Sequence, residues 1–367
     1  MNNLVIVKKH GMQNEDGKII IPAKYKKIKL LKSGIYVAKK FSGEIHLYTK
    51  KGQLSFSSPI WYYKTDKNEN IVALKTTTDW KLIDIDYQKN KIEIHYSGIN
   101  YIINIAYGYI AAKVSNDIND NSIIIYSIRD RLVIINSWEA CEVEIYKQGF
   151  VFFEKDSGLQ SFYNLSGRRI LDYKWTHIEL YSAYILVKAQ KSFSAIPTYG
   201  IFSYEGEPLI SCKYRNLELE NIKIGESVIP LFKVGKIIGS SYKMGLLMLN
   251  GEALVVFGEY DEISIEGDNF IITRDENSDI LYEVNDIEND LQLKFILKGK
   301  KITVFDDNAT LFKVSKRHRV GLYSSSGEEI IPAIYKNIQW KKDNSCIIAT
   351  SFWGNKKEIS LGNCIES

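Results

Sequence analysis

Cysteine and histidine are scarce in this sequence, and their spacing excludes the common metal sites. The five histidines form no HxH or HExxH motif and pair with no cysteine, although zinc sites need such clustered ligands. In a chain without a secretion signal, isolated cysteines favour reduced structural thiols over disulfides. The sequence therefore predicts no metal and no cofactor. The four cysteines are Cys141, Cys212, Cys346 and Cys364.

Targeting signals and long apolar runs are also lacking. The first residues, MNNLVIVKKHGMQ, contain no basic segment ahead of an apolar run and no small-residue cleavage site, both of which a signal peptide has. No apolar run reaches the length of a membrane span. We therefore expect a cytoplasmic protein without a membrane partner.

Motifs of nucleotide binding and nucleophilic catalysis are absent from the sequence as well. There is no GxxxxGK(S/T), no GxGxxG between a strand and a helix, and no GxSxG. Asp84 and Asp86 share one face of an expected strand, but acids at this spacing more often form a solvated face than an acid/base pair. The sequence is therefore interpreted as that of a non-enzymatic protein.

One loop resembles the start of a calcium-binding loop. Asp275, Asn277 and Asp279 have the spacing of the first ligands of such a loop. However, Ile280 stands where the loop needs glycine, and Asp286 stands where it needs a bidentate glutamate. A solvated hairpin loop is the favoured interpretation, with a bound calcium ion as the alternative.

Aromatic and β-branched residues are abundant, and they fall in a repeated pattern. The chain contains 24 Tyr and 15 Phe, which favour strands over helices. GKIIIPAKYKKIKL at 17–30 aligns without gaps to GEEIIPAIYKNIQW at 327–340, and eight positions are identical. Internal repeats of this kind indicate an array of structural units.

A short β-branched run that ends on a polar or charged residue recurs ten times. The starts of successive runs lie 31 to 44 residues apart, and each run is typical of a strand with one end in water. The ten runs are 3–9, 34–40, 70–76, 108–114, 149–155, 183–189, 227–234, 269–275, 309–315 and 345–351.

A second and a third strand are expected after each run. The second strand closes on a glycine-containing turn. Near its start a glycine often follows a bulky residue, as in Val320-Gly321 and Trp353-Gly354, and such a glycine lets a neighbouring strand approach closely. The third strand contains Pro22 or Pro332 in the best-matched units, where the ladder should end because proline has no N–H.

The fourth strand opens on an aromatic residue that is expected to pack at the bend into the strand. In YDEISI at 260–265, Tyr260 occupies this bend, and Ile263 and Ile265 share the core face. SWEACEV at 137–143 fits the same frame, which predicts that Cys141 is a core residue.

These patterns predict an all-β fold: a propeller-like tandem array of short antiparallel four-stranded units of about 35–45 residues, with little or no helix. Residues 1–367 are expected to form a single array of about nine to ten units. Propellers usually have about four to eight blades, so nine to ten units are many for a single closed ring, and an open spiral or a split arrangement competes with it. The apolar segment 97–107 is expected to be buried, and 116–122 and 274–279 are expected to be loops.

The combination of Trp-Gly, a hairpin, Gly, Ile-Ile-Pro and Tyr-x-x-Ile resembles the WG-repeat family, also called KWG repeats, of bacterial β-repeat proteins. Nearly the whole chain fits the pattern, although the middle units keep it more loosely, and Trp80 is followed by Lys81 instead of glycine. The resemblance implies a scaffold without shared catalytic residues. Its best-matched residues are Gly17, Pro22, Tyr25, Gly327, Pro332, Tyr335, Trp353 and Gly354.

Charge is distributed unevenly, although the whole chain carries only +4. Residues 1–51 contain twelve lysines and three acids, a net charge of +9. Residues 252–290 contain thirteen acids and one arginine, a net charge of −12. Charged faces mostly serve solubility, but an acidic sector also attracts a basic partner and speeds its capture.

The leading hypothesis is a non-enzymatic protein-binding scaffold that holds a basic protein against its acidic sector. A narrower form of this hypothesis is an immunity or antagonist protein that blocks a basic partner. The residues assigned to the acidic face are Asp261, Glu262, Glu266 and Asp268.

Two alternatives belong to other functional classes. A hydrolase-like enzyme in a propeller mouth would need carboxylates from different units to converge. A nucleic-acid-binding module would use the basic N-terminal part, where lysines flank Tyr25. Tyr25 is already explained as a framework residue repeated at Tyr335, and the acidic sector would repel phosphate, so a nucleic-acid partner is disfavoured.

Overall fold

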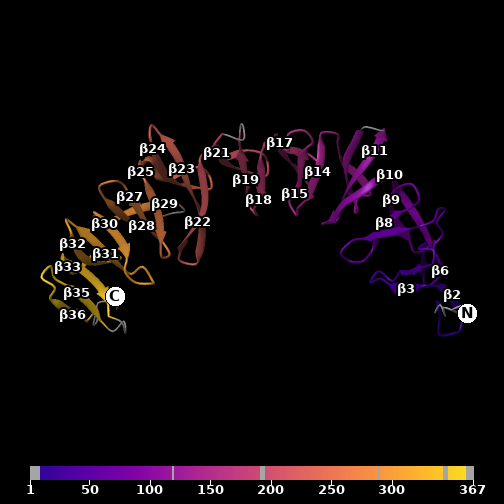
Figure 1. The fold of residues 1–367 in the computed structure, drawn as a ribbon, viewed down its shortest axis with the longest axis horizontal. Coiled ribbons are helices and arrows are strands. Elements are labelled where there is room, and N and C mark those ends of the chain that lie inside the picture. The colour runs from indigo at the N-terminus through magenta and orange to yellow at the C-terminus, as the bar shows by residue number, and fades with distance from the viewer. Residues whose placement is uncertain (1–8, 118–119, 191–194, 288–289, 342–345, 361–367) are drawn as a thin grey trace, which may run out of the picture. The chain divides into compact units, whose positions relative to one another are not determined.

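The computed structural model of this chain describes residues 9–117, 120–190, 195–287, 290–341 and 346–360. Every regular element in these ranges is a β-strand, and neighbouring strands pair antiparallel (Figure 1). The all-β prediction is therefore confirmed. The chain divides into two compact units, unit 1 from Met1 to Leu180 and unit 2 from Tyr181 to Ser367. No helix long and apolar enough to cross a membrane occurs in the described ranges.

Unit 1 contains a two-stranded sheet (β1-β2), four-stranded sheets (β3–β6 and β14–β17), a seven-stranded sheet (β7–β13) and strand β18. Its strands are β1 (His10–Gln13), β2 (Ile19–Tyr25), β3 (Lys27–Leu30), β4 (Tyr36–Lys39), β5 (Ile45–Thr49), β6 (Gly52–Gln53), β7 (Tyr62–Thr65), β8 (Ile71–Lys75), β9 (Trp80–Asp86), β10 (Lys91–Ala106), β11 (Tyr109–Asp117), β12 (Asp120–Ser127), β13 (Leu132–Ser137), β14 (Ala140–Ile145), β15 (Gly149–Glu154), β16 (Gln160–Asn164), β17 (Arg169–Trp175) and β18 (His177–Leu180).

Unit 2 begins with β19–β21 and continues with four-stranded sheets β22–β25, β26–β29 and β30–β33 and a three-stranded sheet, β34–β36. Its strands are β19 (Ile185–Ala189), β20 (Thr198–Phe202), β21 (Pro208–Tyr214), β22 (Asn216–Ile224), β23 (Ser227–Ile238), β24 (Ser241–Met248), β25 (Ala253–Tyr260), β26 (Glu262–Glu266), β27 (Phe270–Arg274), β28 (Asp279–Ile287), β29 (Asp290–Gly299), β30 (Lys301–Val304), β31 (Leu311–Lys316), β32 (Arg319–Ser324), β33 (Glu329–Tyr335), β34 (Asn337–Trp340), β35 (Ile347–Thr350) and β36 (Lys356–Ile359).

The recurring β-branched runs coincide with strands. Each run from 34–40 to 345–351 contains one strand, beginning with β4 and ending with β35. The run at 3–9 lies outside the described residues except for its last position. The repeated four-stranded unit is therefore confirmed, because strands of the same kind recur at the predicted spacing and build sheets of the same order.

Runs in inner sheets are apolar at consecutive positions because both faces of such a sheet pack against neighbouring sheets. In β27, Ile271 packs with Met244 of the preceding sheet, while its neighbour Ile272 packs with Phe312 of the following sheet. Both isoleucines are fully buried. Within unit 2, Figure 1 shows the sheet β26–β29 between β22–β25 and β30–β33. The core therefore lies between successive sheets.

The bend between sheets falls after the predicted aromatic residue. Tyr260 ends β25, and the N–H of Asp261 already donates to the carbonyl of Arg274 in the next sheet at 2.8 Å. Ile263 is buried and Ile265 half-buried, and both belong to the core shared with the preceding sheet, as predicted. The expected fourth strand of each unit is therefore the first strand of the following sheet. The sheet boundary falls one strand earlier than predicted.

A bulge precedes the bend in most sheets. Ile331 and Tyr335 of β33 pair with residues only two apart in β32, so three residues of β33 lie opposite Gly321 alone. A Cβ on Gly321 would lie 2.9 Å from the backbone nitrogen of Ala333, which confirms the predicted close approach. The same three-residue bulge lies opposite Gly11, Ser161 and Gly200.

Two expectations about the repeat motif are corrected by this geometry. Pro22 and Pro332 lie inside these bulges within β2 and β33, where no ladder N–H is needed, and not at the end of a ladder. Trp353 and Gly354 lie in the turn between β35 and β36, not in a strand, and Trp353 is 92% exposed. The Trp-Gly pair thus marks a turn at this place.

The expected position of Cys141 in the core is also corrected. Cys141 is only half-buried, whereas its neighbour Ala140 and Val143 are buried. Trp138, which was expected to pack at the bend, is half exposed. The pairing of β14 with β15 shifts between Ala140 and Glu142, and this irregularity turns the cysteine away from the core face.

Two repeats of unit 1 share one sheet, which departs from the four-stranded pattern. Strand β10 pairs with β9 as far as Ile99 and with β11 from Ile99 onward, so seven strands join in one sheet. The segment 97–107 is only partly buried, because it is a sheet strand with one solvated face: Tyr101 is 60% exposed. The whole described part of 116–122 belongs to strands β11 and β12 and not to a loop, whereas 275–278 is a loop as expected.

Candidate binding site

The four acids assigned to the acidic face do not form one cluster. Glu262 and Glu266 lie in β26, on the face opposite to Ile263 and Ile265. Asp261 lies at the bend before this strand, and Asp268 lies in the turn after it. A strand rises about 3.3 Å per residue, so Asp261 and Asp268 lie at opposite ends of β26, on the order of 20 Å apart. The structure therefore divides the predicted face between two ends of the sheet.

Three of the four acids are also paired with cations. Lys243 Nζ lies 2.6 Å from Asp261 Oδ1, Arg274 Nη1 lies 3.3 Å from Glu262 Oε1, and Lys223 Nζ lies 3.8 Å from Asp268 Oδ2. Lys223 and Lys243 come from the neighbouring sheet β22–β25, so a charge sum over 252–290 does not include them. The local field is therefore weaker than the sequence count indicates.

Exposed acids gather where two long hairpins meet. The tips of the hairpins β22–β23 and β28–β29 pack together through Ile222 and Val284, with Ile224, Ile229, Leu291 and Leu293 around them. The N–H of Lys223 donates to the carbonyl of Asp268 at 2.7 Å, which fixes the β26–β27 turn beside the first hairpin. We define the acidic tip as the exposed carboxylates at this end of the sheets: Glu226, Asp268, Asp286 and Asp290.

Most of the acidic tip was missed by the charge sum. The predicted acidic face included Asp268. Asp286 and Asp290 lie in the acidic sector 252–290 but were not part of that face, and Glu226 lies outside the sector. None of Glu226, Asp286 and Asp290 has an ion-pair partner among the described residues. The signal that could have found Glu226 is the spacing of the repeated runs, which is widest from 183 to 269 and includes the turn of the β22–β23 hairpin.

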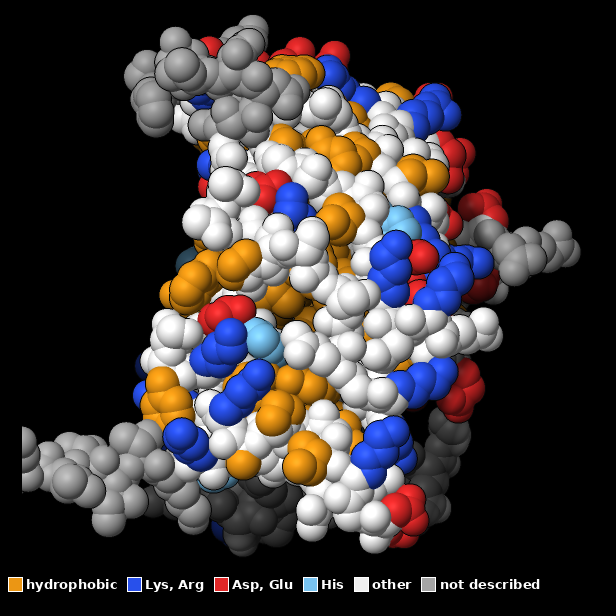
Figure 2. Space-filling view, turned by 90° about the vertical axis from the view of Figure 1, so that its right-hand side faces the viewer, with side chains coloured by type: hydrophobic (Ala, Val, Ile, Leu, Met, Phe, Trp, Pro, Cys, Tyr) orange, Lys and Arg blue, Asp and Glu red, His pale blue; other side chains and the backbone are white. Residues whose placement is uncertain are grey.

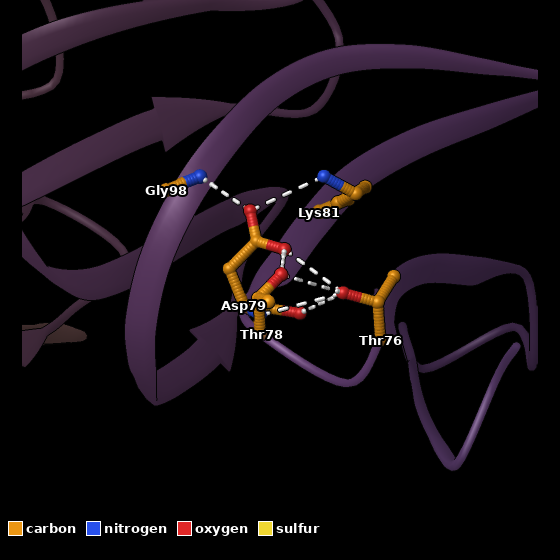
Figure 3. A network of polar contacts seen from close by, with 5 residues as sticks. All are labelled: Thr76, Thr78, Asp79, Lys81 and Gly98. Carbon is orange, nitrogen blue, oxygen red and sulfur yellow. Dashed lines mark hydrogen bonds and ion pairs between the residues drawn. The ribbon is translucent and has the colours of Figure 1, made fainter. Parts of the chain in front are cut away.

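A network around Asp79 joins two repeats of the seven-stranded sheet (Figure 3). Its carboxylate accepts bonds from the hydroxyls of Thr76 and Thr78, each at 2.9 Å, from Lys81 Nζ at 3.2 Å and from the N–H of Gly98 at 2.7 Å. Burial alone would raise the pKa of Asp79, but these bonds outweigh it and lower the pKa to about 2. Asp79 is therefore an ionised structural anchor.

Side-chain to backbone hydrogen bonds of the same kind join other sheets. Gln160 Oε1 accepts the N–H of Ile178 at 2.6 Å, and Asp279 Oδ2 accepts the N–H of Ile302 at 2.8 Å. Like Asp79, both acceptors stand where the second strand of the repeat begins, and both N–H groups belong to the first strand of the next repeat. A polar side chain thus satisfies a backbone N–H that no strand ladder reaches.

The calcium-like loop uses its carboxylates for its own backbone. Asp275 Oδ1 accepts the N–H groups of Asn277 and Ser278, both at 2.7 Å, and these bonds lower the pKa of Asp275. Asp279 is buried and bonds to the next sheet. No group of three or more potential metal ligands occurs in the described part of the chain. The geometry fits the hairpin-loop interpretation.

The carboxylates Asp84 and Asp86 do not act as a pair. Asp84 lines a cavity of about 220 Å³ and forms an ion pair with Arg131. Asp86 instead accepts the N–H of Gln88 at 2.8 Å in the turn after β9. Burial raises the pKa of Tyr126, which also lines the cavity, to about 12. These groups serve local structure, as the solvated-face interpretation implies.

The basic N-terminal part does not offer a stacking surface around Tyr25. The Tyr25 side chain is fully buried, and its hydroxyl is 2.6 Å from that of Tyr48 and 2.9 Å from His46 Nδ1. Lys24 and Lys26 are exposed beside it. Figure 2 shows Lys and Arg side chains in several separate groups on this face of unit 1. The framework interpretation of Tyr25 thus fits its burial.

Comparisons with known proteins identify one repeat of the chain. Residues 11–40 match the family model of the WG containing repeat, so the resemblance to WG repeats is confirmed there. No curated protein matches the chain in sequence.

Three solved structures of the Kluyveromyces lactis protein Hsv2 are similar to this chain. Hsv2 with loop 6CD replaced by a Gly-Ser linker has 11% identity and a TM-score of 0.24, covering 66% of this chain and 99% of that chain. Hsv2 with the complete loop 6CD has 11% identity and a TM-score of 0.24, and a further Hsv2 structure has 10% and 0.23; each covers 78% of this chain and 95% of the other. Likenesses at these values say nothing about function.

Proposed function

We propose that this chain is a non-enzymatic scaffold that binds a basic protein through the acidic tip. The chain is a β-repeat scaffold in its fold, and repeat arrays offer extended surfaces for partners. The observation that carries the proposal is that Glu226, Asp286 and Asp290 are exposed and without ion-pair partners among the described residues, on two hairpins packed against each other. An immunity or antagonist protein is the narrower form of this proposal.

Physical chemistry supports a basic partner at this surface. The two hairpins share the buried side chains of Ile222 and Val284, so their tips are held in place before a partner arrives, and binding costs little ordering entropy. Carboxylates that are not neutralised locally attract a positively charged surface over about 10 Å at moderate salt. Acids that already hold a lysine or arginine, such as Asp261, contribute less.

The test is affinity capture with a charge-reversed tip. The wild-type chain and the variant Glu226→Lys, Asp286→Lys, Asp290→Lys are used as baits at low and raised salt. We expect partners of the wild type to be lost by the tip variant and to dissociate as salt rises, because exposed charges are screened. The matched control, Glu205→Lys, Glu207→Lys, Glu328→Lys, reverses three exposed acids elsewhere in unit 2 and should keep the partners. Retention of the same partners by the tip variant would contradict the proposal.

A further inference from the structure

A cleft of about 1200 Å³ lies in unit 2, at the end of the sheets opposite to the acidic tip. It is lined by the β27–β28 loop, the junction between β29 and β30, and the two-residue turn between β31 and β32. Its charged lining residues, together with one histidine, are Lys298, Lys300, Lys316, Arg317, His318 and Arg319. We call this feature the basic cleft.

The cations of the basic cleft form no ion pair among the described residues. Among the described residues, no carboxylate lines the cleft, and Lys298, Lys300, Arg317 and Arg319 form no ion pair. Lys316 is held by a neutral partner, the hydroxyl of Tyr323 at 3.0 Å. Like charges repel one another, by about 1 kcal/mol per pair at 4 Å in water and by less at larger separations. A bound anion would remove this repulsion.

The turn at the mouth of the cleft has an unfavourable backbone. Arg317 and His318 have φ angles of 46° and 69°, as a two-residue turn of type I′ requires, although such turns favour Asn-Gly. The left-handed conformation costs about 1–2 kcal/mol per residue with a side chain. The corresponding turn between β23 and β24 uses Gly239 at this conformation. Backbone strain of this kind is concentrated at binding sites, and here it presents two basic side chains to the cleft.

The surroundings of the cleft limit the size of its ligand. Asp275 lies near Lys298, on the loop that borders the cleft, and the acidic segment 252–290 continues from there. An extended nucleic acid would pass these carboxylates, and no aromatic side chain lines the cleft to stack with a base. Lysine ammonium groups and arginine guanidinium groups together are typical of phosphate sites.

We propose that the basic cleft binds a compact ligand with several phosphate groups, such as a triphosphate. Its cations would each meet a phosphate oxygen, with charge-assisted bonds of about 1.5–3 kcal/mol each. Asn277 and Ser278, which also line the cleft, offer neutral polar groups at its edge. The site is separate from the acidic tip, so this inference does not depend on the identity of the protein partner.

The first test measures binding of inorganic triphosphate to the full chain by calorimetry and thermal unfolding. We expect saturable binding that raises Tm and weakens with salt. The variant Arg317→Asn, His318→Gly should lower affinity by tenfold or more, on the order of 1.4 kcal/mol. It should fold at least as well as the wild type, because Asn-Gly suits this turn. The control Lys356→Gln, Lys357→Gln removes two exposed cations of unit 2 and should leave affinity unchanged.

A second variant and a second set of ligands complete the test. Lys298→Gln, Lys300→Gln removes charge from the other wall of the cleft, and we expect it to weaken triphosphate binding by tenfold or more. Adenosine triphosphate that binds as well as, or better than, inorganic triphosphate supports the proposal. No Tm shift with triphosphate, equal losses in the cleft and control variants, or tight binding of a single-stranded oligonucleotide in place of triphosphate would each overturn it.

Discussion

Successive repeats in this molecule join in two ways, and the size of one bulge distinguishes the junctions. In β33 of unit 2, three residues bulge opposite Gly321, and the chain bends before β34 begins. In β10 of unit 1, Ser97 and Gly98 bulge opposite Lys81, just after a one-residue bulge at His95, and the strand continues unbroken to Ala106. A bulge bends its strand and increases its twist. We therefore infer that a three-residue bulge ends the sheet, whereas a two-residue bulge lets two repeats share it.

The glycine also changes place between the two junctions. In three of the bent sheets a glycine (Gly11, Gly200 or Gly321) stands opposite the bulge, where a Cβ would meet backbone atoms of the bulged strand at less than 3 Å. In a fourth, Ser161 stands there instead. In the seven-stranded sheet the glycine is Gly98, inside the bulge, and its φ is +78°. Lys81 occupies the opposite position and carries a side chain. A residue with a side chain therefore stands opposite the bulge at both kinds of junction, and the Trp-Lys pair at 80–81 marks the continuous strand only together with the two-residue bulge.

A hydrogen bond between a side chain of one repeat and a backbone N–H of the next is found at both kinds of junction. Asp79 bonds to the N–H of Gly98 within the shared sheet, and Asp279 bonds to the N–H of Ile302 across a bend. The acceptor at the start of the second strand therefore joins consecutive repeats whether or not the sheet breaks. The predictions below test which of these features each junction depends on, beginning with the largest expected effect.

The first prediction concerns the bent junction. Gly321→Val places side-chain atoms where a Cβ alone would be 2.9 Å from Ala333 N, so the bulge must shift. We expect a loss of about 3 kcal/mol in the free energy of unfolding, as for overpacked cores, measured by urea denaturation. The control Glu328→Val, on an exposed turn, should change stability by about 0.5 kcal/mol or less. Equal effects of the two variants would show that the close approach is not needed.

The second prediction concerns the hydrogen bonds of Asp79 in the seven-stranded sheet. Asp79→Asn removes an anion whose pKa of about 2 lies below the ordinary 3.8, and a difference of this size corresponds to about 2.5 kcal/mol. The side chain of Asp79 is only 15% exposed, so solvent screening reduces this value little. The control Glu93→Gln removes one negative charge from the same sheet and should cost about 0.5 kcal/mol or less. A small loss for Asp79→Asn would show that the network adds little.

The third prediction concerns how the contribution of Asp79 to the free energy of unfolding depends on pH. Because the folded-state pKa of Asp79 is lower than the unfolded value, its contribution is complete above about pH 4 and is lost as pH falls toward 2. The difference in unfolding free energy between wild type and Asp79→Asn should therefore shrink across this interval. Urea denaturation at several pH values measures it, and a difference that stays constant below pH 4 would contradict the assignment.

The sequence predicted the repeat and its strands well, and it predicted the junctions and charges poorly. The apolar runs and the aromatic residue Tyr260 reflect local burial, and local burial is visible in the types of consecutive residues. Bulge size depends on pairing with another strand. The lysine at position 81 therefore does not reveal, from the sequence alone, that the sheet continues there. The charge sum over 252–290 did not include Lys223 and Lys243, because these pair with the acids only after the sheets stack.

The fourth prediction concerns the glycine inside the two-residue bulge. Gly98→Ala must adopt a φ near +78°, which costs about 1–2 kcal/mol for a residue with a Cβ. We expect this loss in urea denaturation and also a coupling with Asp79→Asn, because both variants disturb the same hydrogen bond. Gly34→Ala is the matched control, since Gly34 has a φ of +82° and open space around it. It should show a similar loss but no coupling with Asp79→Asn.

The last prediction separates bulge size from the residue opposite the bulge. Lys81→Ala removes a partly buried ion pair with Asp79, at 3.2 Å, and should cost about 0.5–1 kcal/mol. Lys81→Gly recreates the Trp-Gly pair but leaves the bulge at two residues. If bulge size decides the junction, β10 stays continuous in this variant, and the amides of Ile99 and Ile102 keep their protection from hydrogen exchange. Loss of protection at both amides in Lys81→Gly but not in Lys81→Ala would show instead that a glycine opposite the bulge is sufficient to break the sheet.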